Sequence, residues 1–345
     1  MQQSDRLREG DRLMTICNSC RYCEGFCAVF PAMERRLQFS EADLNYLANL
    51  CHNCGECFYA CQYAPPHEFA VNVPKVFAEI RAQSYKKYAW PGRIGAAWWT
   101  AIPFAVVLAL LSPITERVMV GVFGAAGLLV LLSWAIGLSR FWREPIPSRD
   151  RKGAVSAFIA ATKDVLTLSN LSSHGVGCTY PDERHSQARR VFHHLTFYGF
   201  LLCFLSTSVA AFYDNFLEWK PPYPYLSVPV VFGTLGGIGL IAGPIGLLTL
   251  KRRRDERLVD PNQDRMDLSF IGLLLAVAIT GLALMILRTT AAMNSLLVIH
   301  LALVSALFVT FACGKFVHGI YRSAALLRSA LEQRRGNESQ HSRER

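Results

Sequence analysis

Six long apolar stretches constrain the fold of this chain more than any other feature. An α-helix needs roughly 20 residues to cross the hydrocarbon core of a membrane, and none of the six contains Asp, Glu, Lys or Arg. Six such helices buried in a soluble protein of 345 residues would need an implausibly large core. The sequence therefore predicts a mainly α-helical chain with six membrane spans, at residues 94–113, 118–138, 191–213, 226–250, 268–287 and 293–314.

The cations of the chain fall almost entirely on one side of these spans. Of 36 Lys and Arg residues, 33 lie in the N-terminal segment, in the loops 139–190 and 251–267, and after residue 314. Only Arg117, Lys220 and Arg288 lie in the other loops. The cation-rich side of a membrane protein faces the cytoplasm. We therefore expect a multi-pass protein of a bacterial-type inner membrane, with both termini cytoplasmic and no nucleic-acid partner.

Eight of the eleven cysteines form two copies of one spacing in the N-terminal segment. Three closely spaced thiolates typically hold one face of a [4Fe–4S] cluster, and the fourth cysteine of such a run often binds the other cluster. The pattern predicts one cluster on Cys17, Cys20, Cys23 and Cys61, and a second on Cys51, Cys54, Cys57 and Cys27. Zinc and disulfides are the alternatives, and zinc sites use pairs of cysteines whereas disulfides are rare in the cytoplasm.

The segments around these cysteines favour a helical ferredoxin-like domain. No proline directly follows Cys27 or Cys61, unlike in many small ferredoxins, and Ser40 is placed to cap a helix between the two cysteine runs. Residues 73–88 also have helical periodicity. His52 and His67 lie near the cysteines, where we expect surface residues or hydrogen-bond donors rather than ligands.

Histidines at matching depths in the spans suggest a haem. His193 and His194 begin the third span and His318 follows the sixth, so one of the first two can share a haem b with His318. Only one of them can do so, because successive helical residues point about 100° apart. His300 lies ~27 Å from His318 along a helix and has no histidine at its depth, so a second haem is doubtful. Hydrogen bonding between helices is the alternative for all four, and a quinone contact is a further one for His300.

Two other segments have two interpretations each. Residues 154–168, in the loop 139–190, form an apolar helical pattern that lies on the membrane surface or packs on the cysteine domain. The pairs Gly233/Gly237 and Gly239/Gly243 allow close helix packing or make room for a flat cofactor, and close packing is the favoured interpretation. Cys203 and Cys313 are expected to be ordinary buried residues, and Cys178 to lie in a structured loop.

Several stretches resemble the tricarballylate-utilisation protein B family, the CitB-type proteins related to the CobZ fusions. They are the two cysteine runs, RRVFHHLTFYGFLLCF, VFGTLGGIGLIAGP and GKFVHGIYRSAALL, and the resemblance covers essentially the whole chain. It implies an electron-transfer subunit that accepts electrons from an FAD-dependent flavoprotein, which oxidises tricarballylate or a related tricarboxylate. The electrons then pass to membrane quinone. The fused relatives carry flavin, iron–sulfur and haem b.

The predicted organisation is a cytoplasmic domain at 1–92 with two [4Fe–4S] clusters, a membrane domain at 93–320 and a cytoplasmic tail at 321–345. The chain has no GxGxxG fingerprint, no P-loop and no recognisable constellation for substrate chemistry. We therefore expect electron transfer and no catalysis on the organic substrate. The alternatives are a subunit serving a different dehydrogenase or reductase, a membrane redox sensor, and a transporter. A transporter predicts charges within the spans, and a sensor predicts an output domain longer than this tail.

Overall fold

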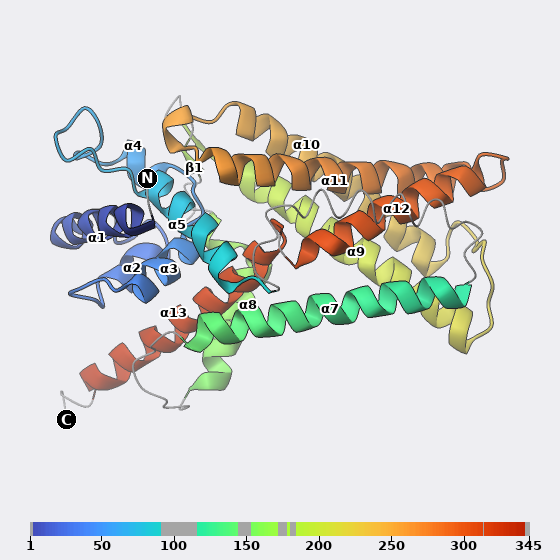
Figure 1. Cartoon of the computed structure of the whole chain (residues 1–345), viewed down its shortest axis with the longest axis horizontal. Helices are drawn as coiled ribbons and strands as arrows, with labels where there is room; N and C mark the ends of the chain where they lie inside the picture. The colour runs from blue at the N-terminus through green and yellow to red at the C-terminus, as the bar shows by residue number, and fades with distance from the viewer. Residues whose placement is uncertain are drawn as a thin grey trace.

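The computed structural model describes residues 3–90, 116–143, 153–171, 178–179, 184–312 and 314–341. It confirms the mainly helical fold, with a group of short N-terminal helices at one end of a bundle of long ones (Figure 1). The N-terminal helices are α1 (Gln3–Cys20), α2 (Val29–Met33), α3 (Glu41–Leu50), α4 (Glu56–Tyr59) and α5 (Val73–Tyr88).

Local capping fixes where the N-terminal helices begin. Ser40 caps α3 as predicted, because its hydroxyl accepts from the Asp43 backbone N–H while the Asp43 carboxylate accepts from the Ser40 backbone N–H. Asn72 caps α5 by accepting from the Lys75 N–H, and Pro74 lies in the first turn, where its missing N–H has no helical partner to lose. Helix α3 therefore ends directly before the second cysteine run, and α5 begins after it.

A continuous apolar core holds the N-terminal helices together. Leu13, Leu47, Phe77 and Ile80 are completely buried, and they come from α1, α3 and α5. Burial of such side chains contributes roughly 1.5–3 kcal/mol each. The N-terminal region is therefore packed like a water-soluble domain, with its apolar side chains inside.

Five described helices are long and apolar enough to cross a membrane, judged by length and composition. They confirm five of the six predicted spans, and the span predicted at 94–113 falls outside the described residues. The five are α7 (Glu116–Arg143), α9 (Ala188–Phe216), α10 (Val228–Arg252), α11 (Pro261–Ile286) and α12 (Met293–Phe311).

Glycines allow α9 and α10 to pack unusually closely. A Cβ atom added to Gly239 of α10 would lie 2.9 Å from the Leu195 carbonyl of α9, and one added to Gly199 of α9 would lie 2.9 Å from the Gly236 carbonyl. Since real Cβ atoms do not approach a carbonyl that closely, only glycine permits this distance between the two backbones. The favoured interpretation of the glycine pairs, close packing, is confirmed.

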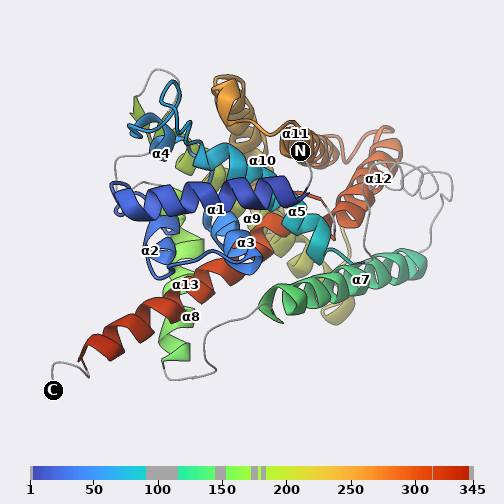
Figure 2. The same ribbon diagram turned by 60° about the vertical axis from the view of Figure 1, so that its left-hand side comes forward.

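Helix α13 (Val317–His341) returns from the membrane helices to the N-terminal domain (Figure 2). The Tyr321 ring packs on Tyr85 and Tyr88 of α5, with ring centroids 5.8 and 5.5 Å apart. Glu332 of α13 pairs with Arg36, which follows α2, at 2.6 Å. This ion pair connects α13 to the N-terminal domain. Most of the segment predicted as a tail at 321–345 is thus a packed helix in the part of the chain that is described.

Helix α8 (Ala154–Thr167) has one buried face and one exposed apolar face. Ala157 and Ala161 are buried, and the helix packs on α13. Its opposite face exposes large apolar side chains: Val155, Phe158, Ile159 and Leu166. The helix is followed by the turn η1 (Ser169–Leu171) and by two short antiparallel strands, β1 (Cys178–Thr179) and β2 (His185–Ser186), which pair Cys178 with Ser186. A further turn, η3 (Glu256–Leu258), joins α10 to α11.

Candidate functional site

The first set of predicted cysteines surrounds one cavity of about 260 Å³. Cys17 and Cys20 lie in the last turn of α1, Cys23 lies in the following turn, and Cys61 lies just after α4. Arg21 ends α1 with a φ of 56°, in the left-handed region, so the chain reverses between Cys20 and Cys23. The cavity also has the ring of Tyr22 at its wall, and that ring is 68% exposed.

The second set lines a neighbouring cavity. Cys51 ends α3, Cys54 and Cys57 flank the start of α4, and Cys27 approaches from the loop before α2. Gly55 has a φ of 90°, which a side chain would strain, and this conformation turns the chain sharply between Cys54 and Cys57. The structure therefore gathers the same two groups of four that the spacing predicts, with Cys61 and Cys27 exchanged between the runs. Their roles as ligands stay a prediction.

Burial makes the charged thiolate form of these cysteines unfavourable in the absence of a metal. Burial, followed by repulsion between neighbouring thiolates, raises the pKa of Cys17 and of Cys23 to about 12. The pKa of Cys57 is also raised, first by burial and then by Cys54 and Cys51. Such thiolates are stable only when a cation compensates their charge. Iron in a cluster supplies that compensation, so the donor sets fit [4Fe–4S] clusters. Among the described residues, no three His, Cys, Asp or Glu side chains are grouped to hold a single metal ion.

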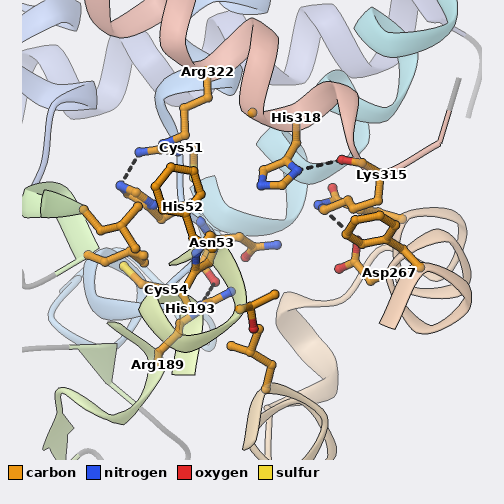
Figure 3. A pocket seen from close by; sticks show the side chains of 18 of the residues that line it. Cys51, His52, Asn53, Cys54, Arg189, His193, Asp267, Lys315, His318 and Arg322 are labelled. Carbon is orange, nitrogen blue, oxygen red and sulfur yellow. Dashed lines mark hydrogen bonds and ion pairs between the residues drawn. The ribbon is translucent and has the colours of Figure 1, made fainter. Parts of the chain in front are cut away.

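A third and larger cavity, of about 380 Å³, lies between the cysteine domain and the long helices (Figure 3). Cys51, His52 and Cys54 form part of its wall at the domain side. His193 from α9 and His318 from α13 face it at the membrane side, and their ring centroids are 6.2 Å apart. The structure therefore brings together two of the four predicted histidines.

The hydrogen bonds of His318 leave one ring nitrogen for a ligand. Its Nδ1 donates to the Lys315 carbonyl over 2.6 Å, so Nε2 carries the lone pair. This is the arrangement by which proteins orient metal-binding histidines. Burial lowers the pKa of His318 to about 3, which keeps the ring neutral. His193 Nδ1 is buried and makes no hydrogen bond within the described part of the chain.

The other two candidate histidines lie apart from this pair. The His194 ring packs against Tyr198, one turn further along α9, with centroids 5.7 Å apart. His300 of α12 shares a hydrogen bond of 2.9 Å with the Thr280 hydroxyl of α11. That bond matches the alternative interpretation of His300, which is contact between helices.

His52 differs from its prediction as a surface residue or hydrogen-bond donor. It lines both the second cysteine cavity and the large cavity, and its Nε2 accepts from the guanidinium of Arg322. Burial and the charge of Arg322 lower the pKa of His52 well below its ordinary value, so the ring is a neutral acceptor. His67 also accepts a hydrogen bond, because its Nδ1 accepts from the Phe69 backbone N–H.

Charged residues of the large cavity were missed by sequence reasoning. Asp267, at the start of the fifth predicted span, pairs with Lys251 at 2.9 Å and with Lys315 at 2.7 Å. Arg254 belongs to the loop 251–267, whose cations the sequence linked only to the orientation in the membrane. In the structure it lines the cavity. Arg322 lies in the GKFVHGIYR stretch, four residues after His318, and this helical spacing places both on one face of α13. That spacing was the only signal available.

The two cysteine-lined cavities, the ferredoxin-like domain and the long apolar helices define an iron–sulfur membrane protein of the electron-transfer class. Residues 10–87 match the family described as Citrate utilization protein B Fer4-like domain, and residues 104–339 match the family described as Citrate utilization protein B. The chain belongs to the Citrate utilization protein B family, which confirms the resemblance found in the sequence. It is 47% identical to the Citrate utilization protein B of Escherichia coli, over 96% of this chain and 94% of that protein. No solved structure matches the chain.

Proposed function

We propose that this protein carries electrons from a cytoplasmic flavoprotein through two [4Fe–4S] clusters and one haem b to membrane quinone. The observation that carries the proposal is that the three cavities form an unbroken series. The first and second cysteine cavities share Phe30, Cys57 and Val73 in their walls. The second cavity and the large cavity share Cys51, His52 and Cys54. Carriers bound in neighbouring cavities would therefore share side chains of the wall between them.

The spacing of His193 and His318 supports a haem in the large cavity. With their ring centroids 6.2 Å apart, His193 and His318 would together hold the iron of one haem b. Clusters and haem, when bound, supply one-electron carriers that divide the electron pair of a reduced flavin.

The residues around the carriers have separate tasks. The Lys315 carbonyl holds the His318 ring in one orientation, and the apolar side chains of the long helices exclude water from the membrane end of the cavity. Tyr22 and Phe69 are exposed on the domain near the first cysteine cavity. We assign that surface to the flavoprotein, because it is the end of the series farthest from the histidine pair.

Orientation and substrate complete the proposal. The concentration of Lys and Arg on one side of the spans supports a cytoplasmic location for the cysteine domain and both termini. The relative is named for citrate utilization, and the sequence resembles proteins that serve tricarballylate oxidation. We therefore propose an FAD-dependent dehydrogenase of tricarballylate or a related tricarboxylate as the partner.

Four measurements, two on the purified full chain and two with its partner, test the proposal. Iron and sulfide should reach the content of two [4Fe–4S] clusters, and a reduced-minus-oxidised spectrum should show one b-type haem. The chain should also co-purify with a flavoprotein, and the pair should reduce a quinone analogue when a tricarboxylate is added. Clusters without any haem band would contradict the haem assignment. A haem band with turnover on no tricarboxylate would instead favour a subunit of a different dehydrogenase.

A further inference from the structure

The wall of the large cavity is divided into an apolar end and a cationic end. Toward the membrane helices it consists mainly of apolar side chains: Phe197, Leu201, Leu247, Ile271 and Leu274. Toward the cysteine domain it carries four arginines: Arg81, Arg189, Arg254 and Arg322. A ligand that fills such a cavity has an apolar body and an anionic end.

Three acidic side chains line the cavity, and Asp164 accepts a hydrogen bond from the Ser169 hydroxyl at 2.7 Å while the other two pair with cations. Asp267 is held between Lys251 and Lys315. Asp255 pairs with Arg257 at 2.6 Å and accepts a hydrogen bond from the Tyr59 hydroxyl at 3.2 Å. Within the described residues, none of these carboxylates forms an ion pair with Arg254 or Arg322.

Arg254 and Arg322 are anchored by neutral acceptors. Arg254 Nη2 donates to the Leu258 carbonyl at 2.8 Å, and Arg322 Nη2 donates to the His52 ring. Within the residues that the structure describes, neither forms an ion pair with a carboxylate. A guanidinium has five N–H donors in a planar fork, so each arginine keeps donors for a second acceptor.

The other two arginines of the cavity hold backbone carbonyls of the cysteine domain. Arg189 donates to the Asn53 carbonyl at 2.9 Å. Arg81 donates to the Ala48 and Cys51 carbonyls at 3.0 and 2.6 Å and to the Gln263 side chain at 3.1 Å. These bonds occupy both terminal nitrogens of Arg81 and tie α5 to α3 and α11. It therefore serves as a structural cation that adds positive charge beside Arg254 and Arg322.

Arg254 and Arg322 remain charged near neutral pH. Burial first, and then the charge of neighbouring arginines, lowers the pKa of Arg254 and of Arg322 to about 10. Cations that are buried beside other cations are unfavourable unless an anion compensates them. The cavity is thus prepared for a bound anionic group.

We propose that Arg254 and Arg322 bind the two propionate carboxylates of the haem b whose iron His193 and His318 hold. This inference rests on the proposed function, because it assumes haem in the cavity. It orients the haem, since Arg322 is bonded to His52 and His52 directly follows Cys51 (Figure 3). The propionate edge faces the second cysteine cavity, and the apolar edge faces the membrane helices.

A reconstitution experiment tests the carboxylate contact directly. The full chain is produced in cells deprived of haem and is then titrated with haem b or with haem b dimethyl ester, whose carboxylates are blocked. The variants are R254Q, R322Q and the double variant. R253Q is the matched control, because Arg253 is the exposed neighbour of Arg254 and does not line the cavity.

Each single variant should lower the affinity for haem b roughly tenfold to a hundredfold, the usual effect of losing a charge-assisted hydrogen bond. The ester should bind the unmodified protein about as weakly as haem b binds the double variant, and the double variant should lose little more with the ester. The haem midpoint potential should also fall in the variants, since a nearby cation favours the reduced state. A tenfold change in that one-electron equilibrium corresponds to 59 mV. R253Q should change neither quantity.

The outcomes separate this inference from the proposed function. Haem binding that is unchanged by the variants and by the ester would overturn the arginine assignment and leave the haem in place. No haem binding to the unmodified protein would overturn both. Recovery of a phospholipid from the purified chain, lost in the double variant, would assign the arginines to a lipid headgroup and contradict the inference. If R322Q does not fold, as judged by iron and sulfide content, R254Q and the ester still decide the question.

Discussion

The N-terminal domain and the membrane helices use the same apolar residues in opposite ways. In the domain, Leu13, Leu47 and Phe77 are completely buried against one another. In α7, by contrast, Leu128 and Leu131 are 59% and 60% exposed. Water drives apolar side chains inward in the first region, whereas lipid leaves no such force between helices in the second. Close packing through glycines then replaces burial as the means of holding the helices together.

The two regions meet at α13 and at the large cavity. Helix α13 supplies His318 to the cavity and, two turns and more beyond it, supplies Leu326 and Glu332 to the domain. The cavity wall likewise combines Cys51 and Cys54 with side chains of α9, α10 and α11. The domain is therefore not merely tethered to the membrane helices, because residues of both regions form the wall of the large cavity.

The largest expected effect comes from removing a cysteine of the domain. Cys54→Ala should reduce the iron and sulfide content to about half, because one of two four-cysteine sets becomes incomplete. Quinone reduction by the complex should fall to background. Cys203→Ala, in α9 outside both sets, is the control and should keep full iron content. Full iron content in Cys54→Ala would contradict the proposed ligand set.

The next effect concerns the membrane side of the large cavity. His318→Ala should remove the haem b band while leaving the iron and sulfide content unchanged, because the cysteine cavities do not include His318. Difference spectra of the purified variants measure this. His300→Ala should keep the band, since that ring bonds to Thr280 of α11. Loss of the band in His300→Ala but not in His318→Ala would reverse the assignment.

Glycine substitution tests how the membrane helices are held together. Gly239→Ala should destabilise the bundle by about 2 kcal/mol, because the new Cβ atom meets the Leu195 carbonyl of α9. Gly272→Ala in α11 is the control, since no atom lies within 4 Å of the added Cβ. It should be neutral or slightly stabilising, as alanine favours a helix. Unfolding of both variants in detergent gives the comparison, and equal stability would refute close packing.

A smaller effect is expected where α13 meets the domain. Glu332 is 9% exposed and pairs with Arg36 and Arg328, so Glu332→Gln should lower the stability of the domain by about 1 kcal/mol. Glu9→Gln breaks a more exposed pair with Arg12 and should change stability by less than about 0.5 kcal/mol. Chemical unfolding followed through the cluster absorbance measures both. A larger loss in Glu9→Gln would show that the α13 contact does not contribute.

The smallest effect is a pH dependence at the start of α3. Burial alone would raise the pKa of Asp43, but the hydrogen bonds from Ser40 and Arg36 outweigh it and lower the pKa below its ordinary value. The stability contributed by Asp43 is therefore present above about pH 4, its unfolded pKa, and is lost as pH falls through the lower folded pKa. Asp43→Asn should reduce this loss between about pH 5 and 3, by less than about 1 kcal/mol. Identical pH profiles would contradict it.

Local patterns predicted much of this molecule. The spacing of the eight cysteines predicted the two groups found around the two cavities, because three closely spaced cysteines of each run face one site and the fourth faces the other. The apolar stretches marked five helices that the structure contains. His193 begins the third predicted span and His318 follows the sixth. Their positions along these spans predicted similar depths in the membrane, and therefore that the two residues lie near each other.

Side-chain direction around a helix axis was not predictable. His193 and His194 were equal candidates, and the choice depends on the rotation of α9. Close contact of Gly199 and Cys203 with α10 fixes that rotation and directs His193 to the His318 ring. Arg254 belongs to a run of cations that looks uniform in the sequence, and only the turn η3 directs this one into the cavity.

The sequence by itself determined five membrane helices and the family, and it predicted the two cysteine sets, because each depends on spacing along the chain. Tertiary structure alone decided that α13 returns to the domain and that His52, Arg254 and Arg322 face one cavity with the histidine pair. The physical reason is that these contacts join residues up to 296 positions apart. Such contacts form only when packing brings distant helices together, and no local periodicity records them.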